Sequence, residues 1–213
     1  MSRQVKLFYD VVSPYSWIGF EVATRYTSCW NMNLQLKPFY LGGVMKASGN
    51  LPPGLLPAKA TYMTQDIMRL AKHFNIPLRF PANFAHVAFE KTTLQPARFL
   101  TAVSLNDPQS LEEVSRQLWL RIWSRDEDVV EDASLRSAAL AAGMEEQMIS
   151  ECLQDTRTPE IKTKLAEVTQ EAIDKGCFGA PYFLIETPKG EKPVFGSDRF
   201  HIIGDLLGER YVG

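Results

Sequence analysis

Two serines, Ser13 and Ser16, enclose a proline and a tyrosine directly after the apolar stretch Val5 to Asp10. Serine is favoured as a helix N-cap and proline as the first helical residue, so Ser13-Pro14 predicts that a strand is followed here by the start of a helix. The first turn of a helix has N–H groups without partners and a partial positive charge. These residues could therefore stabilise an anion, such as a thiolate, beside Ser13.

A second segment with recognisable chemistry lies near the C-terminus. Gly179-Ala180-Pro181 forms a turn that leads into an apolar strand, and a hairpin through Pro188-Lys189-Gly190 follows. We expect Gly196-Ser197-Asp198 to open a last amphipathic helix, which Gly208 ends. This order resembles the C-terminal half of a thioredoxin-like fold, in which Cys-x-x-Cys occupies the place of Ser13 to Ser16 and a cis-proline occupies the place of Pro181. Hydroxyls replace both sulfurs, so we expect the chain to bind the thiol of another molecule.

The middle of the chain reads as helix. Apolar residues recur at helical spacing in three segments: Met63, Ile67, Leu70, Ala71 and Phe74; Leu111, Val114, Leu118 and Ile122; and Ile161, Leu165, Val168, Ala172 and Ile173. The prediction is an α/β fold of disulfide-oxidase-like topology. It consists of a discontinuous thioredoxin-like domain (residues 1–53 and 178–213) with an inserted all-helical domain (residues 54–177). The proline-rich segment Leu51 to Pro57 marks the first boundary.

Trp119 and Trp123 share one face of a predicted helix. Together with Phe89 and Phe99 they could line a pocket for an apolar molecule, although packing between helices is the favoured interpretation.

Composition excludes several classes of partner and site. The net charge of −2 gives no general attraction for nucleic acid or for an anionic membrane, and no apolar run approaches the roughly 20 residues of a membrane span. Three scattered cysteines and three scattered histidines predict neither a disulfide scaffold nor a metal site. Cys177 lies near the proline turn, and we expect it to be a small packing residue rather than a reactive thiol.

Four blocks of the sequence specify one family. The chain resembles the kappa-class glutathione S-transferases in these segments, which occur in the same order: Leu7-Phe8-Tyr9-Asp10 with Ser13-Pro14-Tyr15-Ser16-Trp17; Ser48-Gly49-Asn50 with Pro52-Pro53-Gly54-Leu55-Leu56-Pro57; Leu118-Trp119 with Trp123-Ser124-Arg125; and Phe195-Gly196-Ser197-Asp198-Arg199. The resemblance covers nearly the whole chain. At Ala180 some members carry a larger aliphatic residue, but the family uses the backbone of that position.

The resemblance implies an enzyme in which glutathione, a co-substrate rather than a cofactor, is ionised at Ser13 and attacks a small hydrophobic electrophile. The implied glutathione-binding residues are Ser13, Pro14, Tyr15, Asn50, Lys59, Ala180, Pro181, Ser197 and Asp198. Asp198 suits the γ-glutamyl ammonium, while Ser197 and helix N–H groups suit its carboxylate. Lys59 suits the glycyl carboxylate.

The resemblance also implies a homodimer, a role in detoxification, and a soluble location in the mitochondrial matrix or the peroxisome. The N-terminal residues show no evident presequence, and Tyr211-Val212-Gly213 does not match a peroxisomal signal. Two alternatives stay open. The first is a glutathione-dependent isomerase of the 2-hydroxychromene-2-carboxylate type, which would return glutathione unconsumed. The second is a non-enzymatic, chaperone-like module that binds peptides at the proline turn.

Overall fold

A four-stranded sheet with strand order β2-β1-β3-β4 forms the centre of the computed structural model, which describes residues 2–82 and 92–213. Strand β1 (Arg3–Tyr9) pairs in parallel with β2 (Met32–Pro38) and antiparallel with β3 (Tyr182–Thr187). Strand β4 (Gly190–Phe195) completes the sheet as the hairpin partner of β3. The strand and helix predicted at the N-terminus and the strand, hairpin and helix predicted at the C-terminus are therefore present, and residues about 180 positions apart meet in one sheet.

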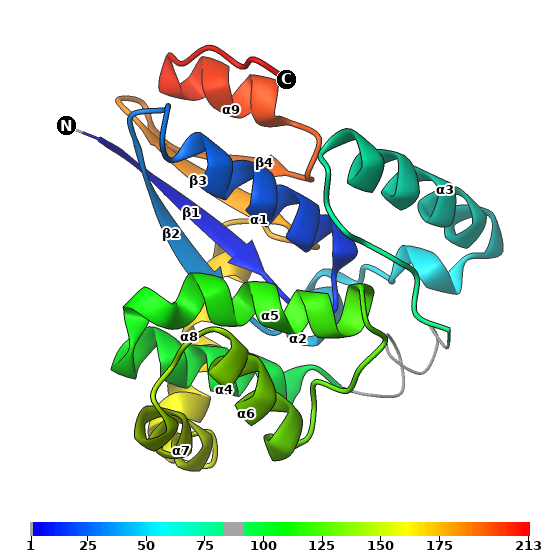
Figure 1. Ribbon diagram of the computed structural model, residues 1–213. Helices are drawn as coiled ribbons and strands as arrows, with labels where there is room; N and C mark the ends of the chain where they lie inside the picture. The colour runs from blue at the N-terminus through cyan, green and yellow to red at the C-terminus, as the bar shows by residue number, and fades with distance from the viewer. Residues whose placement is uncertain (1, 83–91) are drawn as a thin grey trace.

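Helices cover both faces of the sheet (Figure 1). Helices α1 (Pro14–Tyr26) and α9 (Phe200–Leu207) lie on the face that presents Leu7 and Phe183. The opposite face presents Phe8 and Leu184 and packs against α2 (Leu41–Ser48) and α8 (Pro159–Asp174). Alternate residues of one strand point to opposite faces, so the apolar run Leu7-Phe8-Tyr9 at the end of β1, which is buried throughout, fits a strand that is covered on both sides.

The helical region between β2 and β3 contains the predicted helices. These elements are η1 (Pro53–Leu55), α3 (Pro57–His73), α4 (Leu94–Asn106), η3 (Pro108–Ser110), α5 (Leu111–Trp123), α6 (Asp132–Ala141) and α7 (Glu146–Asp155), followed by α8. All three predicted apolar stripes fall on helices, in α3, α5 and α8. One apolar core extends from the sheet into α3 to α8. The division at residues 53–54 and 177–178 stays a prediction.

The tryptophans of α5 pack in the core, as the favoured interpretation had it. Trp119 and Trp123 have no exposed surface, and neither they nor Phe99 line the main cavity. Phe89 lies outside the described residues. The indole N–H of Trp119 donates to the Ser13 carbonyl at 3.2 Å, and that of Trp123 donates to the Val11 carbonyl at 3.4 Å. These tryptophans therefore support the loop before α1 from behind.

The last helix starts about two residues later than expected. Helix α9 begins at Phe200 with Arg199 at the N-cap position, so Ser197 and Asp198 lie in a turn ahead of the helix. Gly196 causes this turn: its φ of +102° is in the region that favours glycine, and a side chain there would meet the Asp198 carboxylate at 2.8 Å.

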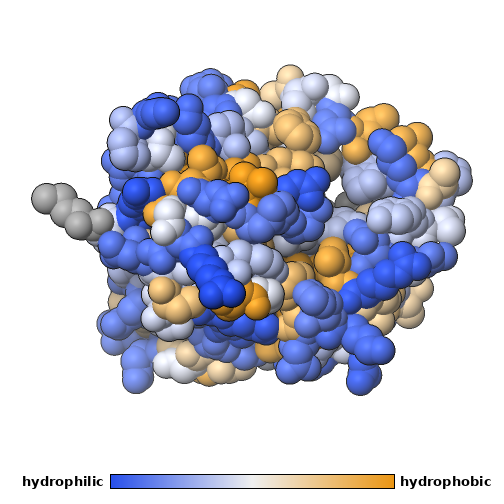
Figure 2. All heavy atoms as spheres, turned by 90° about the horizontal axis from the view of Figure 1, so that it is seen from above, coloured by the Kyte–Doolittle hydropathy of each residue, from blue (hydrophilic) through white to orange (hydrophobic). Residues whose placement is uncertain are grey.

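The outer surface is mixed in character. Hydrophilic residues cover most of the face seen from above, and hydrophobic residues show between them in separate patches (Figure 2). None of the described helices is long and apolar enough to cross a membrane.

Candidate active site

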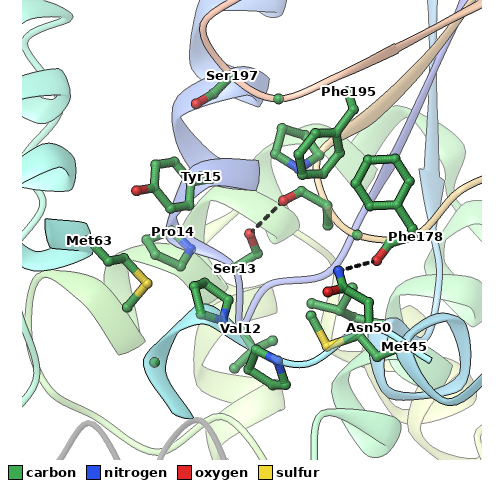
Figure 3. Close-up of a pocket in the computed structure, with 18 of the residues that line it drawn as sticks. Val12, Ser13, Pro14, Tyr15, Met45, Asn50, Met63, Phe178, Phe195 and Ser197 are labelled. Atoms are coloured by element: carbon green, nitrogen blue, oxygen red, sulfur yellow. Dashed lines mark hydrogen bonds between the residues drawn. The ribbon is translucent and has the colours of Figure 1, made fainter. Parts of the chain in front are cut away.

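A cavity of about 770 Å³ opens where α1 begins, between α3 and the turn before β3. Every residue predicted for the site lines this cavity: Ser13, Pro14, Tyr15, Asn50, Lys59, Ala180, Pro181, Ser197 and Asp198. They come from four separate parts of the chain, which only the folded structure brings together. Figure 3 shows Ser13 near the centre of the cavity, with Pro14 and Tyr15 on one side and the Phe178 and Phe195 rings on the other.

The Ser13 side chain is fixed at the start of α1. As predicted, Ser13 is the N-cap, its Oγ accepting from the Ser16 N–H at 3.1 Å, and Pro14 is the first helical residue. The Ser13 carbonyl accepts from the Trp17 N–H, and Pro14 has no N–H. The Tyr15 N–H is the group of the first turn that takes part in none of these bonds. The Ser13 hydroxyl and the Tyr15 N–H are therefore the donors that this helix end offers to an anion.

The proline turn faces Ser13 across the cavity. The Ala180-Pro181 peptide bond is cis, as the thioredoxin-like resemblance implies. The Ser13 hydroxyl donates to the Ala180 carbonyl over a long 3.4 Å (Figure 3), a weak bond that a closer acceptor can replace. Asn50 ties this turn to the end of α2, because its side-chain amide donates to the Phe178 carbonyl at 2.8 Å.

An aromatic pair that the sequence analysis did not identify borders the proline turn. The rings of Phe178 and Phe195 lie 4.5 Å apart between centroids, each residue is partly exposed, and both line the cavity. These residues belong to two segments joined only by the β3-β4 hairpin, so sequence spacing gives no sign that they meet.

Three of the described residues that line the cavity are charged: Lys59, Asp66 and Asp198. Lys59 is exposed, and it is the only lysine or arginine among the described residues that line the cavity. Asp198 is half exposed and already forms an ion pair with Arg199. Because exposed ion pairs contribute only about 0 to 1 kcal/mol, a ligand ammonium can compete for this carboxylate. Ser197 is buried beside it.

Asp10 is a buried carboxylate next to the cavity, bonded to three residues that line it, and nothing in its local sequence predicts this role. It accepts hydrogen bonds from the Val12 N–H at 3.1 Å, the Leu41 N–H at 3.0 Å and the Thr93 hydroxyl at 2.9 Å. Burial raises the pKa of Asp10 to about 6, against the opposing effect of these three bonds. Asp10 therefore joins the loop before Ser13 to the starts of α2 and α4.

Two further groups, the Tyr15 hydroxyl and the Cys177 thiol, supply neither a free hydrogen-bond donor nor an anion at this site. The Tyr15 hydroxyl donates to Asp66 at 2.8 Å, and burial raises its pKa, so it is a protonated donor that is already in use. Cys177 is buried, donates to the Gly179 carbonyl, and has its pKa raised by burial to about 11. It is a packing residue, as expected. Within residues 2–82 and 92–213, no three His, Cys, Asp or Glu side chains form a group that could hold a metal ion.

Comparison with known proteins agrees with this geometry. Residues 4–208 match the family of DSBA-like thioredoxin domains. The chain is 47% identical to glutathione S-transferase kappa 1 of Homo sapiens, covering 100% of this chain and 94% of that protein. It is 36% identical to glutathione S-transferase kappa 2 of Caenorhabditis elegans, over 99% of this chain and 94% of that one.

The isomerase relatives are more distant. The 2-hydroxychromene-2-carboxylate isomerase of Sphingobium xenophagum is 24% identical over 97% of this chain and 99% of its own length. A solved structure of an isomerase of this name, 20% identical, superimposes with a TM-score of 0.75 over 96% of this chain and 94% of that chain, which shows a shared fold. With a full-length identity of 47% to a kappa 1 enzyme, the chain belongs to the kappa-class glutathione S-transferases, on a DsbA-like thioredoxin fold.

Proposed function

We propose that this protein binds glutathione in the cavity, ionises its thiol beside Ser13 and joins the sulfur to a small apolar electrophile, so that the whole glutathionyl group is transferred. The observation that carries the proposal is the pair of donors at the start of α1, the Ser13 hydroxyl and the Tyr15 N–H, placed opposite the Ala180-Pro181 backbone. A cysteinyl residue bound along that backbone would place its sulfur at these donors.

These donors supply enough free energy to ionise the thiol of bound glutathione near neutral pH. A thiol with a pKa near 8.5 is only a few per cent ionised at neutral pH, and lowering this pKa by two takes about 2.7 kcal/mol. A hydrogen bond to a charged group contributes roughly 1.5–3 kcal/mol, and a helix N-terminus contributes up to about 2 kcal/mol. No cationic side chain and no metal is required.

The reaction then needs little further chemistry from the protein. The thiol proton leaves to water, and the sulfur lone pair forms the new bond to the electrophilic carbon. The electron pair of the bond that breaks departs with the leaving group. Ser13 acts as a hydrogen-bond donor throughout and is never deprotonated, so no general base has to accompany it.

The other ends of glutathione would meet the charged residues. We assign the γ-glutamyl ammonium to Asp198, its carboxylate to Ser197 and the adjacent turn, and the glycyl carboxylate to Lys59. Pro14, Asn50 and Ala180 would contact the peptide backbone. Glutathione is the co-substrate, and the proposal includes no separate cofactor.

The apolar part of the cavity is the proposed place of the electrophile. Val12, Leu41, Met45 and Met63 line the cavity near Ser13, and all are apolar. A homodimer, a mitochondrial or peroxisomal location and a role in detoxification are also proposals, supported by the kappa-class relatives of this chain.

The deciding experiment is titration calorimetry with glutathione, followed by a conjugation assay with a nitroaromatic halide. Binding together with stoichiometric loss of glutathione and formation of a thioether is the expected result. An isomerase would bind glutathione but return it unconsumed, and a non-enzymatic peptide-binding module would show little affinity for free glutathione. Family membership at 36–47% identity favours the transferase over both alternatives.

A further inference from the structure

Helix α3 runs beside α1 and projects past its start, over the cavity. Two hydrogen bonds join the helices: Tyr15 to Asp66 at 2.8 Å, and the Arg25 guanidinium to the Phe74 carbonyl at 2.6 Å. Both bonds connect residues in the same chain order, so the helices run in the same direction, side by side (Figure 1). The part of α3 that precedes Asp66, residues 57–65, therefore extends roughly 13 Å beyond the Tyr15 contact.

This projecting part of α3, which we call the overhang (residues 57–65), is held by very little apolar contact. The buried residues of α3 are Met63, Ile67 and Ala71, and only Met63 belongs to the overhang. Lys59 and Tyr62 are exposed, and so are Leu55 and Leu56 just before the helix. Burial of apolar area fixes the second half of α3 far more firmly than the half that borders the cavity.

The Tyr15–Asp66 hydrogen bond is the polar contact that fixes the overhang near the cavity. The Arg25–Phe74 bond lies at the other end of α3 and cannot set the position of residues 57–65. Tyr62 also donates to Asp66, at 3.4 Å, so both carboxylate oxygens of Asp66 have a hydroxyl donor. Asp66 also lines the cavity, and the two tyrosine hydroxyls are the partners of its negative charge there.

We propose that Tyr15 and Asp66 are positioning residues for glutathione: their hydrogen bond holds the overhang so that Lys59 faces the glycyl carboxylate. This inference rests on the proposed function of the cavity. Glutathione has two carboxylates and one ammonium, and Lys59 is the only cationic side chain among the described lining residues. A shift of the overhang would move this charge away from the ligand while leaving Ser13 in place.

The test is glutathione affinity, measured by calorimetry, in Tyr15→Phe, Asp66→Ala and the double variant. Each single variant is expected to bind glutathione about fivefold more weakly, because the displaced overhang loses the pairing of the exposed Lys59 with the glycyl carboxylate. The double variant should be no weaker than either single variant, because both changes break the same bond. Asp66→Asn, which keeps an acceptor oxygen for Tyr15, should recover most of the affinity.

Three tests separate positioning from a general structural effect. Gln65→Ala is the matched control: Gln65 is exposed on α3, bonds only Arg69 among the described residues, and does not line the cavity, so its loss should not change affinity. In a Lys59→Ala background, Tyr15→Phe should have almost no further effect, since the pair acts through Lys59. In Tyr15→Phe the change should appear in KM for glutathione, and the pKa of the bound thiol should not move.

Several outcomes would overturn the inference. These are wild-type affinity in Tyr15→Phe, an undiminished effect in the Lys59→Ala background, or a shifted pKa of the bound thiol, which would place the Tyr15 hydroxyl at the sulfur. Hydrogen exchange provides a measurement without ligand: amides of residues 57–65 should exchange faster in Tyr15→Phe than in Gln65→Ala. A wild type that fails to bind glutathione refutes the proposed function, whereas unchanged exchange in Tyr15→Phe refutes the positioning bond by itself.

Discussion

The two walls of the cavity differ in how they are anchored. At the start of α1, Pro14, Ser16 and Trp17 are buried, and the carbonyls of Val11 and Ser13 accept from buried indoles of α5. The wall formed by α3 has three buried residues among seventeen, and one hydrogen bond fixes its cavity end to α1. The donors for the sulfur thus stand on the more constrained of the two walls, and the cation for the far end of the ligand stands on the less constrained one.

This difference matches what each wall has to do. Stabilising a thiolate depends on donors within hydrogen-bond distance of one atom, so the helix start must be preorganised before the ligand arrives. Pairing a lysine with a carboxylate tolerates larger displacements. A segment with few buried contacts also opens at a lower free-energy cost, so the α3 wall is the one expected to yield when a ligand enters.

The largest expected effect concerns Asp10, which lies just before the wall formed by the start of α1. Burial raises the pKa of Asp10 from 3.8 to about 6, so the folded protein holds this proton more tightly than the unfolded chain does. Stability from this group is fully present below pH 3.8 and is lost as the pH rises to about 6. The loss amounts to about 3 kcal/mol.

Urea unfolding of the wild type and of Asp10→Asn between pH 4 and 7 measures this effect. The asparagine variant has its own fixed cost, so only the pH dependence is compared. The free energy of unfolding of the wild type should fall relative to that of the variant up to about pH 6 and then run parallel to it. If the unfolding free energies of the two proteins run parallel over the whole pH range, the three hydrogen bonds lower the pKa of Asp10 by as much as burial raises it.

The next effect concerns the chemistry at Ser13. Ser13→Ala should reduce conjugation near neutral pH by roughly ten- to a hundredfold, because the thiolate loses a hydrogen bond of about 1.5–3 kcal/mol. Glutathione should still bind, and the absorbance of the bound thiolate should titrate at higher pH. Raising the pH should restore part of the rate.

Ser16→Ala is the matched control for this substitution. The Ser16 hydroxyl is buried and has no hydrogen-bond partner among the described residues, so removing it should leave the rate and the fold nearly unchanged. A Ser13→Ala variant whose bound thiol titrates at the wild-type pH would assign the ionisation to the Tyr15 N–H and the helix terminus, and Ser13 would be only a cap.

Local sequence signals predicted the start of α1 and the buried faces of the helices well. The Ser13-Pro14 pair specifies a helix start through its own chemistry, and the apolar stripes of α3, α5 and α8 specify buried faces through their spacing. Ala180-Pro181 was placed by its position ahead of a strand. In each case the residues that carry the signal are also the residues that form the structure.

Contacts between distant segments account for what was missed. Asp10 receives its donors from α2 and from Thr93, 83 residues away, and Asp66 meets Tyr15 across 51 residues, so neither role leaves a mark in local spacing. The start of α9 failed for a different reason. Ser197 and Asp198 are good capping residues, but the positive φ of Gly196 turns the chain there and delays the helix to Phe200.

The smallest expected effect tests the weakly held glutamyl end at Asp198. Its side chain is 52% exposed and pairs with an equally exposed Arg199, so solvent screens whatever it binds. Asp198→Asn should therefore raise the glutathione Kd only about fivefold, or about 1 kcal/mol. Arg199→Ala should lower the Kd by up to about twofold, because it frees the carboxylate for the ligand ammonium.

A glutathione analogue without the ammonium should bind the wild type and Asp198→Asn equally well by calorimetry. If the analogue distinguishes the two proteins, or if Asp198→Asn binds glutathione as the wild type does, then Asp198 serves only to hold Arg199, and the glutamyl end depends on Ser197 and the turn.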